Sequence, residues 1–187
     1  IDAFFSEAKN GTSYYGSIMA SVRTSIFADI DGVHPLDLVL ARNGQNQLLL
    51  GTPDYTWVPV TESWLPAVSD NTTEAIVVDF DGDGDQDIYS ANFGQDRAIL
   101  REAAALYADV TTSSLPDSDA VTRNSAGGAA VDLDGDGLPE IVLANWSAHR
   151  TSLLGNLGEG IFADQTANLP EDWDYSRDIY FIDLDGD

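Results

Sequence analysis

Residues 79–87 read Asp-Phe-Asp-Gly-Asp-Gly-Asp-Gln-Asp, with carboxylates at positions 1, 3, 5 and 9 and a further aspartate at position 7. Short apolar stretches flank this loop, Ala75–Val78 before it and Ile88–Tyr89 after it. Both stretches are too short for helices and are bounded by Asp or Gly. The segment therefore predicts two β-strands joined by an acidic turn.

The Asp-x-Asp element of this loop recurs along the chain. Its first aspartates are Asp29, Asp79, Asp132 and Asp183, separated by 50, 53 and 51 residues. In the first three units an aromatic residue, a threonine and a Leu-Pro pair follow in the same order. They are Trp57, Thr61 and Leu65-Pro66; Tyr107, Thr111 and Leu115-Pro116; and Phe162, Thr166 and Leu169-Pro170. Chance does not keep several landmarks in phase, so the chain contains a repeat of about 50 residues.

Each repeat reads as four short strands. In the third, the strands beside the acidic loop are followed by apolar stretches at 152–154 and 160–163, with a turn at 156–160 between them. Four strands in about 50 residues are typical of a propeller blade. A β-sandwich is the alternative, but its strands have no reason to repeat in phase. The sequence predicts an all-β chain, a β-propeller of four-stranded blades, with the repeated aromatic residues packed between blades.

The repeat also predicts how the chain is divided. We expect residues 1–187 to form part of a propeller of about three and a half blades. Its parts are the end of a preceding blade at 1–20, repeats at 21–70, 71–120 and 121–174, and the start of a fourth at 175–187. Asp187 is only the fifth position of a fourth loop, and the chain begins at Ile1 rather than Met. We therefore expect a processed or truncated start and an intact domain that is longer.

The charge and the cysteine content of the chain limit the classes of partner that it can bind. Asp and Glu number 32 against 8 Lys and Arg, a formal net charge of -24, while 43% of the residues are hydrophobic. The chain is therefore not a disordered acidic tail, and neither nucleic acid nor an anionic membrane is an expected partner. Cysteine is absent, which excludes disulfides and thiolate metal sites. Divalent cations are the natural partners of so many carboxylates.

The second loop has the chemistry of a Ca²⁺ site. Calcium takes six to eight oxygen ligands, which alternate side chains and the backbone carbonyl of Asp85 at position 7 would supply. Gly84 at position 6 permits a sharp turn. An EF-hand is excluded because it needs an acid at position 12, which is Ser90 here and Leu143 in the third loop. Magnesium is disfavoured because it requires strict octahedral geometry.

The other loops follow the pattern to different extents. The third offers Asp132, Asp134, Asp136, the carbonyl of Leu138 and Glu140. The fourth begins with Asp183, Asp185 and Asp187. In the first, Val33 occupies position 5 and His34 replaces the glycine, leaving Asp29, Asp31 and Asp37. We expect the first loop to be the weaker candidate, with a metal-free polar turn as the alternative.

This loop, followed by apolar residues and Ala-Asn (Ala91-Asn92, Ala144-Asn145), resembles the FG-GAP/VCBS repeat. That repeat builds the seven-bladed propeller of integrin α-subunits and of many bacterial surface proteins. The tail from Phe162 to Pro170 is similar to the bacterial and cartilage-acidic-protein branch. The resemblance implies seven blades in the intact protein and a set of Ca²⁺ ligands. Those ligands are Asp79, Asp81, Asp83, Asp85, Asp87, Asp132, Asp134, Asp136, Leu138 and Glu140.

These observations favour a non-catalytic, calcium-binding extracellular module. We expect it at the cell surface or secreted, contacting other proteins or copies of itself in adhesion, a filament or a scaffold. A lectin with Trp64, Trp146 or Trp173 at the blade rims is an alternative. A propeller-type polysaccharide lyase is another, and it would need a Lys, Arg, His or Tyr cluster beside a Ca²⁺ loop.

Two further motifs give weaker signals. His34 and His149 are the only histidines, and neither lies in a nucleophile motif, so nothing indicates a Ser-His-Asp triad. Asn10, Asn71 and Asn145 open glycosylation sequons, which matter only where the chain is exposed to glycosylation.

Overall fold

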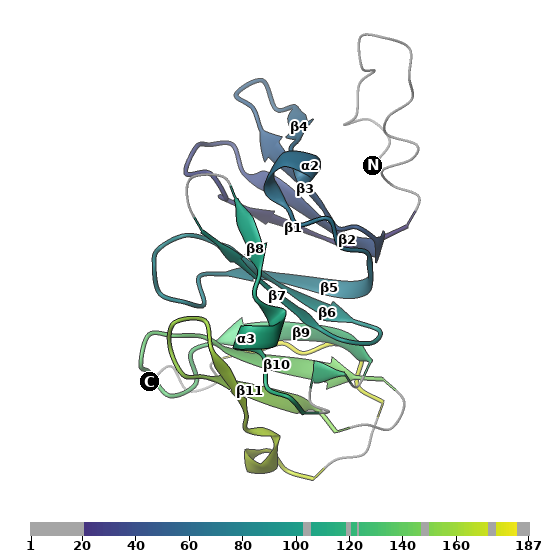
Figure 1. Ribbon diagram of the computed structural model, residues 1–187, viewed down its shortest axis with the longest axis vertical. Helices are drawn as coiled ribbons and strands as arrows, with labels where there is room; N and C mark the ends of the chain where they lie inside the picture. Colours follow the sequence, from purple (N-terminus) through teal and green to yellow (C-terminus); the bar gives the residue numbers. More distant parts are fainter. Residues whose placement is uncertain are drawn as a thin grey trace.

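The strands in the described part of the chain fall into three groups of four (Figure 1). The computed structural model describes residues 21–102, 106–118, 121–122, 124–146, 150–171 and 175–182. The first group is β1 (Val22–Ala28), β2 (Asp37–Gly44), β3 (Gln47–Gly51) and β4 (Trp57–Pro59). The second is β5 (Asp70–Val78), β6 (Asp87–Asn92), β7 (Arg97–Arg101) and β8 (Tyr107–Asp109). The third is β9 (Ser125–Val131), β10 (Glu140–Asn145), β11 (Ser152–Asn156) and β12 (Phe162–Asp164).

Within each group the strands pair antiparallel in chain order, the arrangement of a propeller blade. A short bridge of two residue pairs, Asn43 with Asn71 and Gly44 with Asp70, joins the first blade to the second. Among the first strands of the blades, β5 contacts both β1 and β9. The structure is thus a partial propeller of about three blades, which confirms the predicted all-β propeller fold. The repeat boundaries stay predictions, and residues 1–20 lie outside the described part.

A short helical turn follows the last strand of each blade, which the sequence pattern did not predict. These turns are α2 (Thr61–Trp64), α3 (Thr111–Ser114) and the 3₁₀ turn η2 (Thr166–Asn168). The repeated threonine begins each turn, and its hydroxyl accepts a hydrogen bond from an amide of the third strand. The three bonds are Leu48 N to Thr61 at 3.0 Å, Ala98 N to Thr111 at 3.2 Å and Leu153 N to Thr166 at 3.2 Å. The hydrogen bond of the repeated threonine therefore connects each helical turn to the third strand of its own blade.

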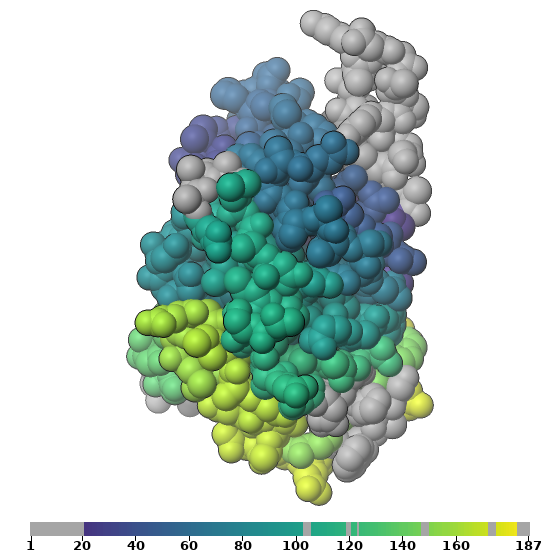
Figure 2. All heavy atoms as spheres, viewed as in Figure 1, coloured from purple at the N-terminus to yellow at the C-terminus, as the bar shows by residue number. Residues whose placement is uncertain are grey.

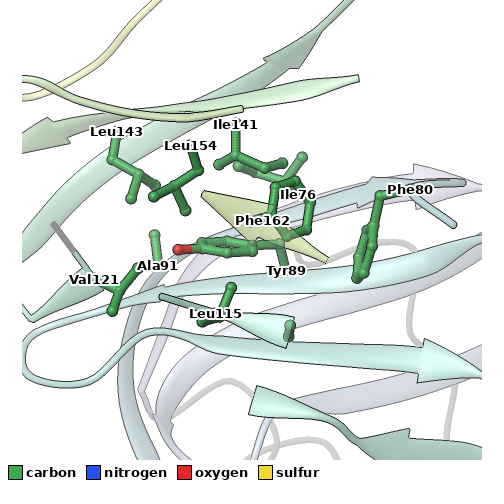
Figure 3. Packing of buried hydrophobic residues seen from close by; sticks show 11 residues of the cluster. Ile76, Phe80, Tyr89, Ala91, Leu115, Val121, Ile141, Leu143, Leu154 and Phe162 are labelled. Atoms are coloured by element: carbon green, nitrogen blue, oxygen red, sulfur yellow. The ribbon is translucent and has the colours of Figure 1, made fainter. Parts of the chain in front are cut away.

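The core lies between neighbouring blades. Phe80 of the second blade is fully buried and packs against Phe162 of the third, with 5.5 Å between ring centroids. Figure 3 shows this cluster, in which Tyr89 and Leu154 also meet. Between the first and second blades, Tyr107 packs with Ile30 in an equivalent cluster. Tyr107 and Phe162 therefore lie between blades as predicted.

The blades follow one another along the long axis of the molecule (Figure 2), as the succession of blue, teal and green atoms shows. Because β1, β5 and β9 run in the same sense, the loops that follow them emerge at the same edge of each blade. These three loops span residues 29–37, 79–87 and 132–140, the acidic segments identified in the sequence.

Candidate metal centres

Three acidic groups stand at equivalent places, each in the loop between the first two strands of a blade. In each group, ligand oxygens of three aspartates lie within 4.8 Å of one another. The groups are Asp29, Asp31 and Asp37; Asp79, Asp81 and Asp87; and Asp132, Asp134 and Asp136. Positions 1 and 3 of the loop therefore converge in every blade, as the Asp-x-Asp spacing predicted.

Backbone amides hold these carboxylates in place. Asp79 accepts hydrogen bonds from Gly82 N at 2.8 Å and from Gly84 N at 2.9 Å, one on each carboxylate oxygen. Asp81 accepts from Asp83 N at 3.1 Å. Gly82 and Gly84 have φ of 82° and 95°, a conformation in which a Cβ atom is strained. The glycines thus let the loop fold back and aim its amides at its own acids.

The third loop repeats this arrangement closely. Asp132 accepts from Gly135 N at 2.8 Å and from Gly137 N at 3.0 Å. In the first loop Asp29 accepts from Gly32 N at 2.9 Å, and His34 stands where the second glycine lies in the other two loops.

The acid at position 9 joins its loop to the third strand of the blade. Asp87 accepts from Phe80 N at 3.0 Å on one oxygen and from Arg101 N at 2.9 Å on the other. Asp37 does the same with the amides of Ile30 and Gly51, both at 2.8 Å. Glu140 contacts Leu133 N at 2.8 Å and Asn156 N at 3.5 Å. This acid is buried in all three blades.

Burial makes the charge of these acids unfavourable in the absence of a cation. Desolvation raises the pKa of Asp87 to about 7, and the neighbouring charges of Asp81 and Asp79 raise it as well, while two backbone hydrogen bonds lower it. Desolvation also raises the pKa of Asp37 and of Asp81. A divalent cation among these groups would favour their ionised forms.

The donor set fits a hard cation. Every side-chain ligand in the three groups is a carboxylate oxygen, and an oxygen that accepts one N–H keeps a second lone pair for a metal. Oxygen-only sites with several carboxylates suit Ca²⁺ and Mg²⁺ rather than zinc or copper. Three carboxylates, a backbone carbonyl and water would complete a coordination shell.

Some predicted ligands do not join the groups. The side chain of Asp85 pairs with Arg101 at 3.0 Å, and those of Asp83 and Glu140 lie outside the clusters. The carbonyls of Asp85 and Leu138 stay predicted ligands. The acids Asp183, Asp185 and Asp187 lie outside the described residues.

The first loop, expected to be the weaker candidate, brings its three acids within the same 4.8 Å as the other two. Its difference lies at position 5, where Val33 is exposed and offers no carboxylate. The first loop is thus a group of three acids, without the aspartate that the other two loops carry at position 5.

Two residues that the sequence did not single out reach from their own blade to the acidic loop of the preceding blade. The guanidinium of Arg101 in the second blade donates through Nη1 to the carbonyl of Ile30 in the first loop. Asn156 of the third blade donates through Nδ2 to the carbonyl of Phe80 in the second loop at 2.9 Å. The first blade has Gly51 at this position. Since Gly, Arg and Asn share no chemistry, no pattern indicated them.

The remaining sequence candidates take part in packing. Trp146 lies under the guanidinium of Arg177, 4.9 Å from its ring centroid, and its ring meets Phe93 at 6.2 Å. Asn145 is fully buried and donates to Ser152 Oγ at 2.9 Å. Trp173, His149 and Asn10 lie outside the described residues. Across the described ranges, no helix has the length and apolar character needed to cross a membrane.

Comparison with known families agrees with this geometry. A profile described as an FG-GAP-like repeat matches the chain three times, at residues 29–90, 79–142 and 132–187. A comparison with curated proteins finds no match. Each matched segment begins at the first aspartate of an acidic loop, and together the segments run from residue 29 to residue 187. The chain therefore belongs to the FG-GAP-like repeat family.

Proposed function

We propose that this protein is a calcium-stabilised, non-catalytic propeller module that works outside the cell and uses its loops to contact other proteins or further copies of itself. One observation carries the proposal. Three acidic groups recur at the same place in three successive blades, each with its carboxylate oxygens within 4.8 Å of one another. Such a repeat of convergent carboxylates is costly without a cation, because like charges repel.

Calcium is the best match among oxygen-seeking cations. Its flexible shell of six to eight oxygens tolerates the small differences between the three loops, whereas magnesium does not. In the second loop Asp79, Asp81 and Asp87 would hold the ion, which would supply a positive charge that ties β5 to β6. Since the unfolded chain does not present these ligands together, metal binding energy becomes folding energy.

A structural role is favoured over catalysis by the burial of the polar side chains nearest the loops. Arg101 and Tyr107 stand beside the second loop, the kind of pair that a lyase would need. Their exposed fractions are 8% and 6%, and both are engaged: Arg101 with Asp85, and Tyr107 with the carbonyl of Gln86 at 2.8 Å. A substrate would not reach them, so their arrangement supports a role in holding blades together.

The proposed calcium binding favours an extracellular setting. The acidic loops lie at the edge of the molecule and resemble Ca²⁺ sites of modest affinity. Such sites have Kd values of about 10⁻⁴ to 10⁻³ M and fill where calcium is abundant. Exposed acids at positions 3 and 5, such as Asp134 and Asp136, would leave a bound ion open to water. Stacked repeats present many loops on a rigid body, an arrangement suited to protein contacts.

The test is a thermal melt of the full chain in calcium and in EDTA, with ions counted by native mass spectrometry. At about 100 times Kd, each site adds about 2.7 kcal/mol of stability, which corresponds to roughly 5–10 °C in Tm for a protein of this size. We expect at least two bound Ca²⁺ and a clear fall of Tm in EDTA.

A pair of variants makes the test specific. Asp81→Asn in the second loop should remove one ion. Asp54→Asn, at an exposed aspartate on the same edge but outside the loops, should remove none. A wild-type protein that binds no Ca²⁺ and melts at the same temperature in EDTA would show that the acidic loops are plain turns.

A further inference from the structure

A continuous chain of hydrogen bonds links the three acidic loops. Within a loop, the acid at position 9 accepts from the amide of position 2 and from an amide at the end of the third strand. Between blades, the carbonyl of position 2 accepts from the side chain of that same third-strand residue in the next blade. The two kinds of bond alternate, so no loop is isolated from its neighbour.

The first junction runs through Arg101. Its side chain donates to the carbonyl of Ile30 in the first loop, and its own amide donates to Asp87 of the second loop at 2.9 Å. The same guanidinium pairs with Asp85 of the second loop at 3.0 Å. One buried residue therefore contacts two candidate metal loops from two different blades.

The second junction repeats this topology with a different side chain. Asn156 donates through Nδ2 to the carbonyl of Phe80 in the second loop at 2.9 Å, and to Pro139 O at 3.1 Å. The amide of Asn156 faces Glu140 of the third loop at 3.5 Å. The connection from one loop to the next thus appears twice, built from Arg in one case and Asn in the other.

Packing reinforces both junctions. Ile30 and Phe80, the position-2 residues, are fully buried, and each inserts into a cluster that includes the aromatic landmark of the next blade, Tyr107 or Phe162. Each position-2 residue also lies between the two aspartates that open its loop. The peptide groups that carry these aspartates are therefore held by the following blade through both apolar and polar contacts.

We propose that the three loops bind cations cooperatively, with Arg101 and Asn156 as the positioning residues that carry the coupling. This inference rests on the proposed calcium-binding function. An ion in the first loop would fix the aspartates on either side of Ile30 and with them the Ile30 carbonyl. Because this carbonyl accepts from the Arg101 side chain, Arg101 is then fixed as well. The amide of Arg101 in turn orients Asp87 of the second loop. Part of the second loop is then already ordered before calcium binds there. Binding at the second loop therefore costs less conformational entropy, and its affinity for calcium rises.

The test reads each loop separately, by hydrogen exchange of the full chain at increasing CaCl₂. The quantity is the calcium concentration at which amides of residues 79–87 become half protected. Asp31→Asn, which disables the first loop, should raise this midpoint about fivefold, the lower end of usual coupling between sites. In an Arg101→Met background, Asp31→Asn should leave the midpoint of residues 79–87 unchanged.

Controls separate coupling from general destabilisation. Arg23→Met makes the same change at an exposed arginine near the start of β1, at the end of that strand remote from the first loop. The Arg23 guanidinium lies over the ring of Phe93. Coupling between the loops should persist in this variant. Asp85→Asn removes the ion pair of Arg101 but keeps the bond to Ile30, and coupling should persist there too. If Arg101→Met does not fold, the same test can be made at the second junction, between the second and third loops. Asp134→Asn should then raise the midpoint of residues 79–87, and Asn156→Leu should abolish that rise.

Two outcomes have distinct meanings. Calcium-dependent protection of residues 79–87 with a midpoint that Asp31→Asn and Asp134→Asn leave unchanged would overturn the coupling and keep the proposed function. A complete lack of calcium-dependent protection in the wild-type chain would overturn the proposed function itself, and the coupling with it.

Discussion

Replacing Phe80 by alanine tests how the acidic loops are joined to the next blade. Phe80 is the second residue of its loop, is fully buried and packs against Phe162 across the boundary between blades. Removing such a ring costs about 3–5 kcal/mol, from the lost transfer free energy and the cavity left behind. For a chain of this length, that corresponds to a fall of roughly 6–20 °C in Tm.

The repeat provides a matched control at the same position of the third loop. Leu133 follows Asp132 as Phe80 follows Asp79, but its exposed fraction is 51%. Leu133→Ala should therefore cost about 0.5 kcal/mol or less, the usual range of a surface substitution. The two variants share their place in the loop and differ in the burial of the side chain.

Thermal and urea melts of the full chain in about 1 mM CaCl₂ would measure both changes. Phe80→Ala should also require more calcium for protection of residues 79–87, because the ring orders the loop between Asp79 and Asp81. Equal losses of stability in Phe80→Ala and Leu133→Ala would refute the reasoning, since burial between blades would then not decide the effect of position 2.

Two other predictions concern a buried aspartate of the second blade and a tightly packed glycine of the first. Burial raises the pKa of Asp96 to about 8, so between about pH 4 and pH 8 the folded protein keeps a proton that the unfolded chain has lost, and stability falls as pH rises. Asp96→Asn should reduce this dependence of stability on pH by up to about 1.4 kcal/mol per pH unit. Urea melts of the wild type and the variant at about pH 5.5 and pH 7.5 would measure it. A variant with the same pH dependence as the wild type would contradict this prediction. At Gly51, a Cβ atom would lie 2.5 Å from the carbonyl oxygen of Leu36 and 2.6 Å from that of Pro35. Gly51→Ala should therefore destabilise the first blade by about 1–3 kcal/mol, and an unchanged Tm would count against the packing described here.

The periodic features of this fold could be predicted from the sequence because each one recurs. Asp79 and Asp81 predicted the loop, the flanking apolar residues predicted β5 and β6, and the phase of the landmarks predicted blades. The role of Thr111 was not predictable, although its position was. A threonine three or four residues before Leu-Pro gives no sign that its hydroxyl accepts the amide of Ala98 on another strand.

The contacts between blades could not be predicted, because they depend on side chains that differ from one repeat to the next. Arg101 and Asn156 occupy the same place at the end of the third strand, and the first blade has Gly51 there. Only the fold shows that a guanidinium and an amide both reach the carbonyl of position 2 in the preceding loop. A functional position whose chemistry changes from repeat to repeat leaves no repeated signal in the sequence.

The acid at position 9 shows how one residue serves both the fold and the metal site. Glu140 is one methylene longer than Asp87, yet its two oxygens face the same pair of amides, those of Leu133 and Asn156. The longer side chain keeps the structural contacts, while the aspartate group in its loop forms with Asp136 instead of Glu140. The structural demand is therefore the stricter of the two: position 9 must bind two amides to close the loop against the third strand. The third carboxylate of a group comes from position 5 in one loop and from position 9 in the other two. This freedom explains why the first loop, which lacks an acid at position 5, still assembles a group of three through Asp37.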